Sequence, residues 1–216
     1  MLNSTLIYES ELCAIAYEAN KYPECETGGD LYGLWTADGI PVIFLATGPG
    51  KNAVHQNAQY QMDVEYEQKC ESILIEQFGI HYLGDWHSHH KLNIYEPSCG
   101  DRDRIRQIFH KNSKITHMAE MIVNHAEETG KKEMVSAYIY NKLVQKSDIK
   151  IMKTKSSPFR NKLQMMNESK EFNLIEGKLL LNQIIIRKPE EKIYSNGKLE
   201  NLPLDEKSTI MITLER

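Results

Sequence analysis

The stretch "GDWHSHHKLNIYEPSCGD", residues 84–101, is the part of the sequence from which fold and chemistry can both be predicted. It continues the apolar run "IHYL", so His87 and His89 lie two residues apart in a short predicted strand. Side chains in a strand alternate between its two faces, and the two imidazoles therefore point the same way while Trp86 and Ser88 point the opposite way. We therefore assign Trp86 to the core.

The second half of this stretch predicts the start of a helix. Ser98-x-x-Asp101 is a variant of the capping box, in which the serine hydroxyl satisfies free amides at the helix N-terminus. The short loop before it could also fold Asp101 back toward His87 and His89. Two imidazoles and one carboxylate form the three-ligand set of a catalytic zinc site, which keeps a fourth position for water. The cap and the metal site can coexist.

A hydrolytic zinc site also needs a carboxylate that accepts a proton without binding the metal. The segment "ECETGGDLYG" places Glu24 and Glu26 just before a predicted strand, with Gly28 and Gly29 allowing close backbone approach. An ordinary surface acid is the alternative interpretation for either residue. Composition does not choose between the two.

Hydrophobic periodicity predicts an alternation of helices and strands up to about residue 150. Helical spacing indicates helices over 10–20 and 63–78 and a third one after Ser98, and Gly79 ends the second. Strands are expected over the following ranges: 28–35, 40–47, 80–90, 117–125 and 133–141. Asp38-Gly39 and the polar loop "AEETGKK" read as hairpin turns. The order αββαβαββ predicts an α+β fold with a mixed sheet.

The sequence becomes polar and lysine-rich after residue 150. We therefore predict a main domain over 1–150 and a small β-rich accessory region over 151–216. A short helix is expected after Pro158. Asn196-Gly197 predicts a hairpin, and "STIMITLER" a closing strand. We expect this region to serve in recognition or docking. Dimerisation or extension of the sheet are the alternatives.

Composition excludes several classes of protein. The 26 Lys and Arg and 30 Asp and Glu of this 216-residue chain give a net charge of -4 with both signs interspersed, which argues against a nucleic-acid partner. No apolar run approaches the ~20 residues of a membrane span, and the N-terminus lacks the features of a signal peptide, so we predict a cytoplasmic protein without membrane attachment. Four scattered cysteines without a CxxC pair indicate neither a zinc knuckle nor a disulfide framework.

Taken together, the motifs resemble the JAMM/MPN (JAB) metalloprotease family, most closely its prokaryotic JAB branch. The resemblance covers about residues 5–145 and is carried by Glu26 with Gly29, Leu31 and Gly33, by "TGPG" at 47–50, and by "YLGDWHSH" and "PSCGD". It implies a JAB/MPN-like mixed β-sheet flanked by helices. It also implies Zn2+ on His87, His89 and Asp101, Glu26 rather than Glu24 as general acid/base, and Ser98 as stabiliser of the oxyanion.

The resemblance further implies an isopeptidase, similar to deubiquitinases, that cleaves after the C-terminal glycine of a ubiquitin-like protein. E1-like and E2-like enzymes are expected beside it, in a bacterial conjugation or anti-phage system. Three alternatives stay open. They are a hydrolase for a sulfur carrier or a small-molecule amide, a non-catalytic MPN docking module, and a thiol enzyme that uses Cys99 or Cys25 as nucleophile.

Two features depart from the family pattern. His90 stands where the family usually has proline, and the spacer to Ser98 is one residue longer than the commonest form. We interpret His90 as an exposed loop residue; the alternative is an imidazole that meets metal or substrate.

Overall fold

The computed structural model describes residues 4–90, 94–126, 132–141, 143–165, 174–175, 177–189, 193–195 and 198–200. The first half of the chain contains two helices and six strands: β1 (Ser4–Ile7), α1 (Glu9–Asn20), β2 (Gly28–Trp35), β3 (Pro41–Ala46), β4 (Val54–Gln56), β5 (Gln59–Gln61), α2 (Val64–Phe78) and β6 (His81–Ser88). The second half contains α3 (Cys99–Lys111), β7 (Met118–Ala126), β8 (Lys132–Tyr140), β9 (Val144–Ile151), α4 (Pro158–Met165), a 3-10 turn (Leu181–Gln183), β10 (Ile184–Ile186), β11 (Ile193–Ser195) and β12 (Lys198–Glu200). All helices and strands predicted up to residue 150 are present.

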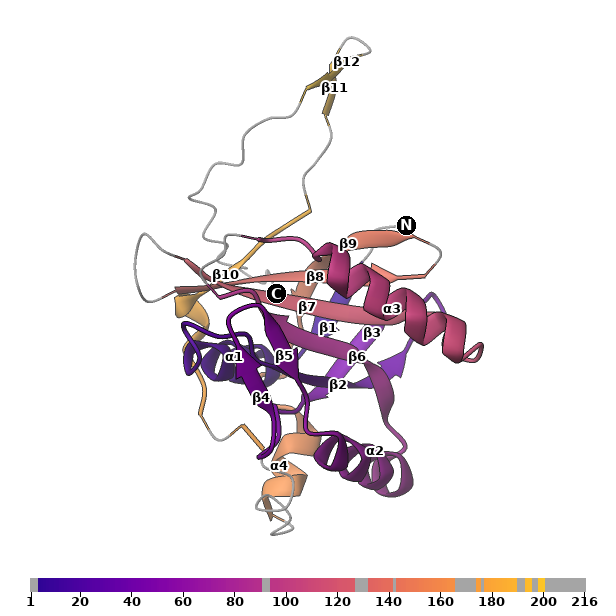
Figure 1. Cartoon of the computed structure of the whole chain (residues 1–216), viewed down its shortest axis with the longest axis vertical. Coiled ribbons are helices and arrows are strands. Elements are labelled where there is room, and N and C mark those ends of the chain that lie inside the picture. Colours follow the sequence, from indigo (N-terminus) through magenta and orange to yellow (C-terminus); the bar gives the residue numbers. More distant parts are fainter. Residues whose placement is uncertain are drawn as a thin grey trace.

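Seven of the strands form a sheet that closes on itself. Its order is β8-β7-β6-β2-β3-β1-β9, and β9 pairs back onto β8. β1 lies parallel to both β3 and β9, β6 lies parallel to β7, and the remaining pairs in the ring are antiparallel. β10 adds a short parallel pairing at the start of β8. The sheet is mixed, as predicted, but it is closed (Figure 1).

The predicted fold class, a JAB/MPN-like sheet flanked by helices, is therefore wrong. That prediction lacked β1 and β9, the two strands through which the sheet closes. β1 has four residues, and β9 reads "VQKSDIKI", in which polar side chains interrupt the apolar ones. Neither segment carries the apolar alternation by which strands are recognised.

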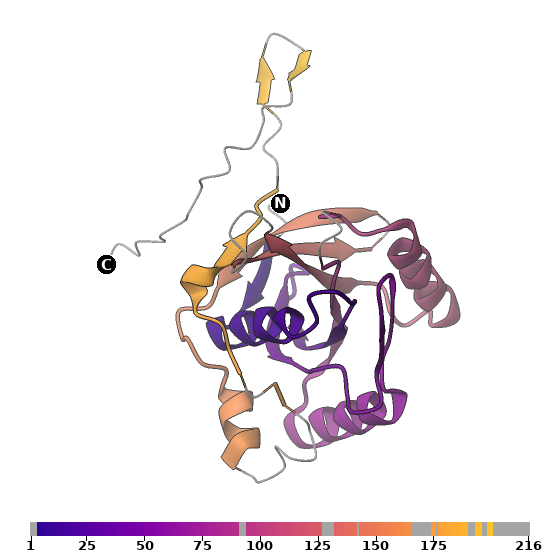
Figure 2. The ribbon, with the colours of Figure 1, turned by 60° about the vertical axis from the view of Figure 1, so that its left-hand side comes forward.

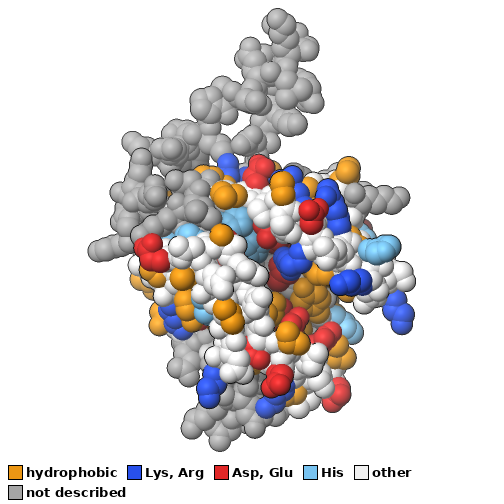
Figure 3. Space-filling view, in the orientation of Figure 1, with side chains coloured by type: hydrophobic (Ala, Val, Ile, Leu, Met, Phe, Trp, Pro, Cys, Tyr) orange, Lys and Arg blue, Asp and Glu red, His pale blue; other side chains and the backbone are white. Residues whose placement is uncertain are grey.

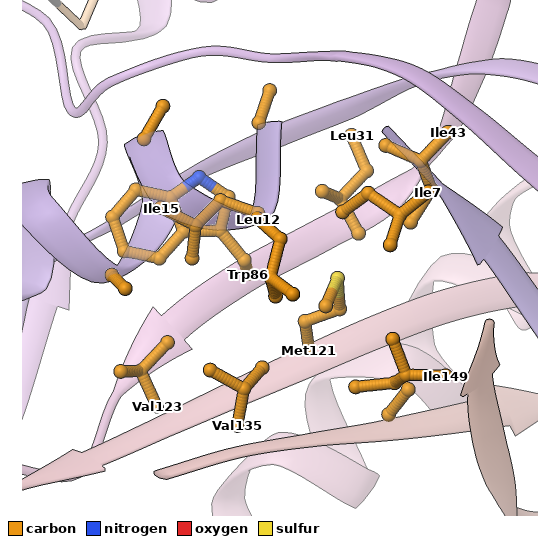
Figure 4. Packing of buried hydrophobic residues seen from close by; sticks show 14 of the residues in the cluster. Ile7, Leu12, Ile15, Leu31, Ile43, Trp86, Met121, Val123, Val135 and Ile149 are labelled. Carbon is orange, nitrogen blue, oxygen red and sulfur yellow. The ribbon is translucent and has the colours of Figure 1, made fainter. Parts of the chain in front are cut away.

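The inner face of the closed sheet packs around α1, as Figure 2 shows. Leu12, Ile15 and Ala16 are fully buried there, and α1 contacts β3, β6, β7 and β8. Trp86 belongs to the same cluster and lies against these helix residues (Figure 4), which confirms its assignment to the core. A helix that is buried on nearly every side must be apolar almost all round, and α1 largely is.

The outer face carries the other helices. α2 and α4 cover β2 and β3 through a second apolar cluster that includes Tyr32, Leu45, Leu74 and Leu163. α3 covers β7 and β8 through Ile105, as part of a third cluster. Because α3 lies over the outer face beside β6, it is placed next to the outward-facing histidines.

Part of the predicted accessory region packs onto the closed sheet. The helix predicted after Pro158 is α4, and Arg160 on it pairs with the buried Glu11 of α1. β11 and β12 pair antiparallel, which confirms the predicted hairpin; its turn at 196–197 and the "STIMITLER" segment lie outside the described residues. The division at residue 150 stays a prediction. Among the described residues, no helix is long and apolar enough to cross a membrane.

Candidate metal centre

The end of β6 places both histidines on the outer face of the sheet. His87 pairs with Gly28 of β2 and with Ile122 of β7, and the backbone N–H of His89 donates to the Val123 carbonyl at 2.9 Å. A Cβ atom at position 28 would lie 2.5 Å from the Trp86 carbonyl oxygen, so glycine is required for this close pairing. His87 and His89 are 8% and 3% exposed. Two paired neighbours therefore fix the strand that carries them.

The start of α3 brings Asp101 to the histidines. The predicted capping box is present: Ser98 Oγ accepts from the Asp101 N–H at 3.2 Å, and the Ser98 N–H donates to Asp101 Oδ2 at 2.7 Å. The cap fixes both the first turn of the helix and the orientation of the Asp101 carboxylate. One short motif thus ends the loop and presents a potential ligand.

Three potential ligand atoms converge at this point. His87 Nε2 lies 3.5 Å from Asp101 Oδ1, His89 Nε2 lies 3.4 Å from Asp101 Oδ2, and the two Nε2 atoms are 3.0 Å apart. One ligand atom from each of the three residues lies within 4.8 Å of the others. Two neutral imidazoles and one carboxylate are the donors that zinc takes in open sites. The residues present therefore fit the metal that the sequence predicts.

The electrostatics of the cluster favour a cation. Burial lowers the pKa of His87, but the Asp101 carboxylate and then Glu120 outweigh it and raise that pKa to about 9. Burial would raise the pKa of Asp101, but its bonds to His87 and His89 hold the pKa well below its ordinary range. Positive charge among these side chains is thus stabilised, whether a proton or a metal ion carries it.

Glu26 lies beside the cluster and is half-buried, whereas Glu24 is exposed. Burial raises the pKa of Glu26 above its ordinary value, and His87 and His89 lower it in part, so the carboxylate is close enough to interact with both. The hairpin of β4 and β5 holds its backbone: the Glu26 N–H donates to the Gln56 carbonyl at 2.9 Å. A half-buried acid that interacts with the histidines but is outside the three-ligand group is a candidate for the general base.

A second group of possible ligands shares His87 with the first. It consists of Asp85, His87 and Glu120, all buried. The guanidinium of Arg104 already pairs with both carboxylates of this group, at 2.5 Å from Asp85 and 3.3 Å from Glu120. The positive charge of Arg104 therefore already compensates the carboxylates of the second group. The His87, His89 and Asp101 group is the better candidate for a metal ion.

Several side chains and contacts around the site were not predicted. His90 is 7% exposed rather than an exposed loop residue, has a φ of 32°, and its ring bonds to the Asn57 carbonyl of the hairpin. His89 Nδ1 lies 2.7 Å from the carbonyl oxygen of Ile94, which orients the ring so that Nε2 faces Asp101. The sequence carries no signal for either contact, because the hairpin strands have three residues each and backbone carbonyls are common to all residues.

The cysteines lend little support to a thiol enzyme. Cys13 and Cys70 are buried, and burial raises the pKa of each above the ordinary thiol value, Cys13 to about 11 and Cys70 to about 12. Cys25 contacts the Asn57 amide oxygen at 3.9 Å, and Cys99 is exposed at the start of α3. A thiol nucleophile is activated by a basic neighbour, whereas Cys25 contacts an uncharged amide.

Histidine, acidic and basic side chains gather on this face of the molecule, between the β4–β5 hairpin and α3 (Figure 3).

The chain is similar to a probable metalloprotease. That relative is the probable metalloprotease y4qB of Sinorhizobium fredii, 31% identical over 107 residues, which are 47% of this chain and 63% of the relative. The chain thus spans less than two thirds of the length of the relative. The relative is named a metalloprotease, and the His87, His89 and Asp101 group of this chain has the donor set of an open metal site.

No family model matches the chain. A solution structure of a protein from Desulfitobacterium hafniense is similar over 68% of this chain and 92% of its own, with a TM-score of 0.53 and 19% identity, which is a likeness of fold alone. A second solution structure, from Salinibacter ruber, has a TM-score of 0.43 and 18% identity over 67% of this chain and 88% of its own.

Proposed function

We propose that this chain is a zinc-dependent peptidase or isopeptidase of the JAMM type, which hydrolyses the bond after the C-terminal glycine of a ubiquitin-like protein. One observation carries the proposal: His87, His89 and Asp101 converge, and Glu26 lies beside them without joining them. The similarity to a probable metalloprotease supports the chemistry at a coarser level.

The roles of the residues follow from their positions. His87, His89 and Asp101 would hold Zn2+, which when bound polarises a carbonyl and lowers the pKa of water. Glu26 takes the proton from the attacking water and returns it to the departing amine, and burial favours this role because it raises the pKa of its carboxyl toward neutrality. The Ser98 hydroxyl oxygen accepts a hydrogen bond as the helix cap, and its hydrogen is donated to the developing oxyanion.

The substrate is proposed from the motif resemblance and from the shape of the site. The tail of a ubiquitin-like protein is extended, and an extended chain binds by pairing with a free strand edge. The two-stranded sheet of β4 and β5 lies beside Glu26 and offers strands for such pairing. E1-like and E2-like enzymes of a bacterial conjugation or anti-phage system are the proposed partners. The relative from Sinorhizobium fredii is bacterial, which agrees with this setting.

The test is cleavage of a fusion between a ubiquitin-like protein encoded nearby and a reporter. We would compare the zinc-loaded wild type with Glu26→Gln, and use Glu24→Gln as the matched control, since it removes the same charge two residues away. We expect the wild type and Glu24→Gln to cleave and Glu26→Gln to lose at least ~100-fold in rate at unchanged zinc content. Equal activity of Glu26→Gln would refute the assignment of the base.

The same panel separates the remaining alternatives. Cleavage of linear fusions without cleavage of lysine-linked conjugates would indicate processing of a sulfur carrier instead. Zinc-loaded protein that binds the ubiquitin-like partner but cleaves neither substrate would indicate a docking module. Loss of activity on alkylation, with no effect of chelation, would indicate a cysteine nucleophile.

A further inference from the structure

Arg104 connects the helix that carries Asp101 to the strand that carries His87. It lies on α3 one turn after Asp101, and its guanidinium reaches down to the sheet. Nη1 and Nη2 donate to the two carboxylate oxygens of Asp85 on β6, at 2.5 and 3.0 Å. Nη2 also donates to Glu120 Oε1 on β7, at 3.3 Å. A planar fork of this kind fixes the orientation of both partners as well as their distance.

The carboxylates that Arg104 meets belong to a buried row across three neighbouring strands. Asp30 pairs with Asp85 in the register of β2 and β6, and Asp85 pairs with Glu120 in that of β6 and β7. The three are 1%, 4% and 0% exposed. Tyr140 donates to Glu120 at 2.5 Å. Buried carboxylates are costly unless they are paired, so Arg104 is needed to keep two of them at this place.

The row lies directly behind a metal ligand. Asp85 precedes His87 by two residues on the same face of β6, and Glu120 Oε1 lies 3.8 Å from His87 Nδ1 while Nε2 faces Asp101. Metal-binding histidines commonly direct the second ring nitrogen to a carboxylate, which fixes the orientation of the ring. The 3.8 Å separation is that of an ion pair rather than of a hydrogen bond. The position of Glu120 therefore decides how well it can fix the orientation of the His87 ring.

We propose that Arg104 is a positioning residue of the metal centre, which acts through Asp85 and Glu120 on His87 and through α3 on Asp101. One guanidinium sets the distance between the two elements that supply the ligands. Its positive charge also pairs with Asp85 and Glu120, so these two carboxylates need no second metal ion. This inference rests on the metal centre of the proposed function, but not on its substrate or its peptidase activity.

The test is the dissociation constant for Zn2+, measured on the metal-free full chain by competition with a chromogenic chelator. Arg104→Gln removes the charge, and Arg104→Lys keeps it but loses the fork. Arg106→Gln is the matched control, because Arg106 lies on the same helix, is 74% exposed and pairs with Asp103. We expect Arg104→Gln to weaken zinc binding by about 10- to 100-fold, Arg104→Lys by less, and Arg106→Gln by under about twofold.

A structural readout accompanies the affinity. The visible spectrum of the Co2+-loaded protein reports ligand geometry, and we expect it to change in Arg104→Gln and Arg104→Lys but not in Arg106→Gln. If Arg104→Gln does not fold, Arg104→Lys decides the question alone. Wild-type zinc affinity and an unchanged cobalt spectrum in a folded Arg104 variant would overturn the proposal. Absence of cleavage by the wild type would count against the proposed substrate and leave the zinc result unaffected.

Discussion

Replacement of Arg160 by Met should destabilise the whole closed sheet, although Arg160 lies ten residues beyond the predicted domain boundary. Its side chain is 8% exposed and faces the fully buried carboxylate of Glu11 on α1. Nε donates to Glu11 Oε1 at 2.8 Å and Nη2 to Oε2 at 2.7 Å, and Nη1 donates to the Ile175 carbonyl at 2.9 Å. Glu11 in turn accepts from the Ala46 N–H of β3 at 2.9 Å.

The magnitude follows from what the substitution leaves behind. Removing one partner of a buried ion pair strands the other charge and costs about 3–5 kcal/mol. At ~2–4 °C per kcal/mol for a domain of this size, the melting temperature should fall by roughly 6–20 °C. Glu11→Gln in the same chain removes the stranded charge, so the double variant should recover much of the loss.

The assay is urea unfolding followed by tryptophan fluorescence, because Trp86 is 1% exposed in the core. Lys162→Met is the control, because Lys162 lies on α4 like Arg160 but is exposed. Its Nζ atom lies 5.0 Å from the centre of the Phe78 ring on α2, and its loss should cost under ~1 kcal/mol. A loss below about 1 kcal/mol in Arg160→Met would refute the reasoning. It would show that the ion pair between Arg160 and Glu11 does not stabilise the closed sheet.

Three further predictions concern buried polar groups and the metal. Burial, and then Glu67, raise the pKa of Asp30 well above its ordinary value, so folding loses stability as pH rises past the unfolded value of ~3.9. Asp30→Asn should therefore raise the urea midpoint at pH 7 and change it little near pH 3; an equal effect at both would contradict this. Both polar atoms of the Asn124 amide are buried without a partner among the described residues, so Asn124→Leu should stabilise the fold by about 1 kcal/mol in urea unfolding, and a destabilised variant would point to a hidden partner. Chelation should lower the melting temperature of the wild type, by an amount that grows with the logarithm of its zinc affinity, and should leave that of His87→Ala unchanged; an equal shift in both would place the metal elsewhere.

The elements that the sequence predicted are those specified by local patterns. α2 has an apolar face at helical spacing and ends at Gly79, whose φ of 62° is one that glycine adopts readily. α3 begins at the predicted serine cap. The two histidines share a face because a strand alternates, whatever surrounds it. These residues are close in sequence, so short-range rules were sufficient for them.

Closure of the sheet depends on contacts that are distant in sequence. β1 pairs with β9 across more than 140 residues, and the buried hydroxyls of Thr5 and Ser147 lie 2.8 Å apart between the two strands. Polar residues at these positions look like loop residues in the sequence, because only a partner on the neighbouring strand makes their burial favourable. The same polar character concealed both strands and produced the wrong fold class.

The candidate site shows the same division between local and distant determinants. Its three converging ligands lie within fifteen residues of one another, which is why a single stretch predicted them. Of the groups that hold these ligands, the Ile94 carbonyl on His89 lies in the same stretch, in the loop that folds back on the histidine, whereas Glu120 at His87 comes from β7. None of these contacts follows from residue type, since a carbonyl or a buried acid acquires its role only from the strand or loop beside it. The identity of the ligands is therefore a local property of this sequence, whereas their geometry is set by the closed sheet and by α3.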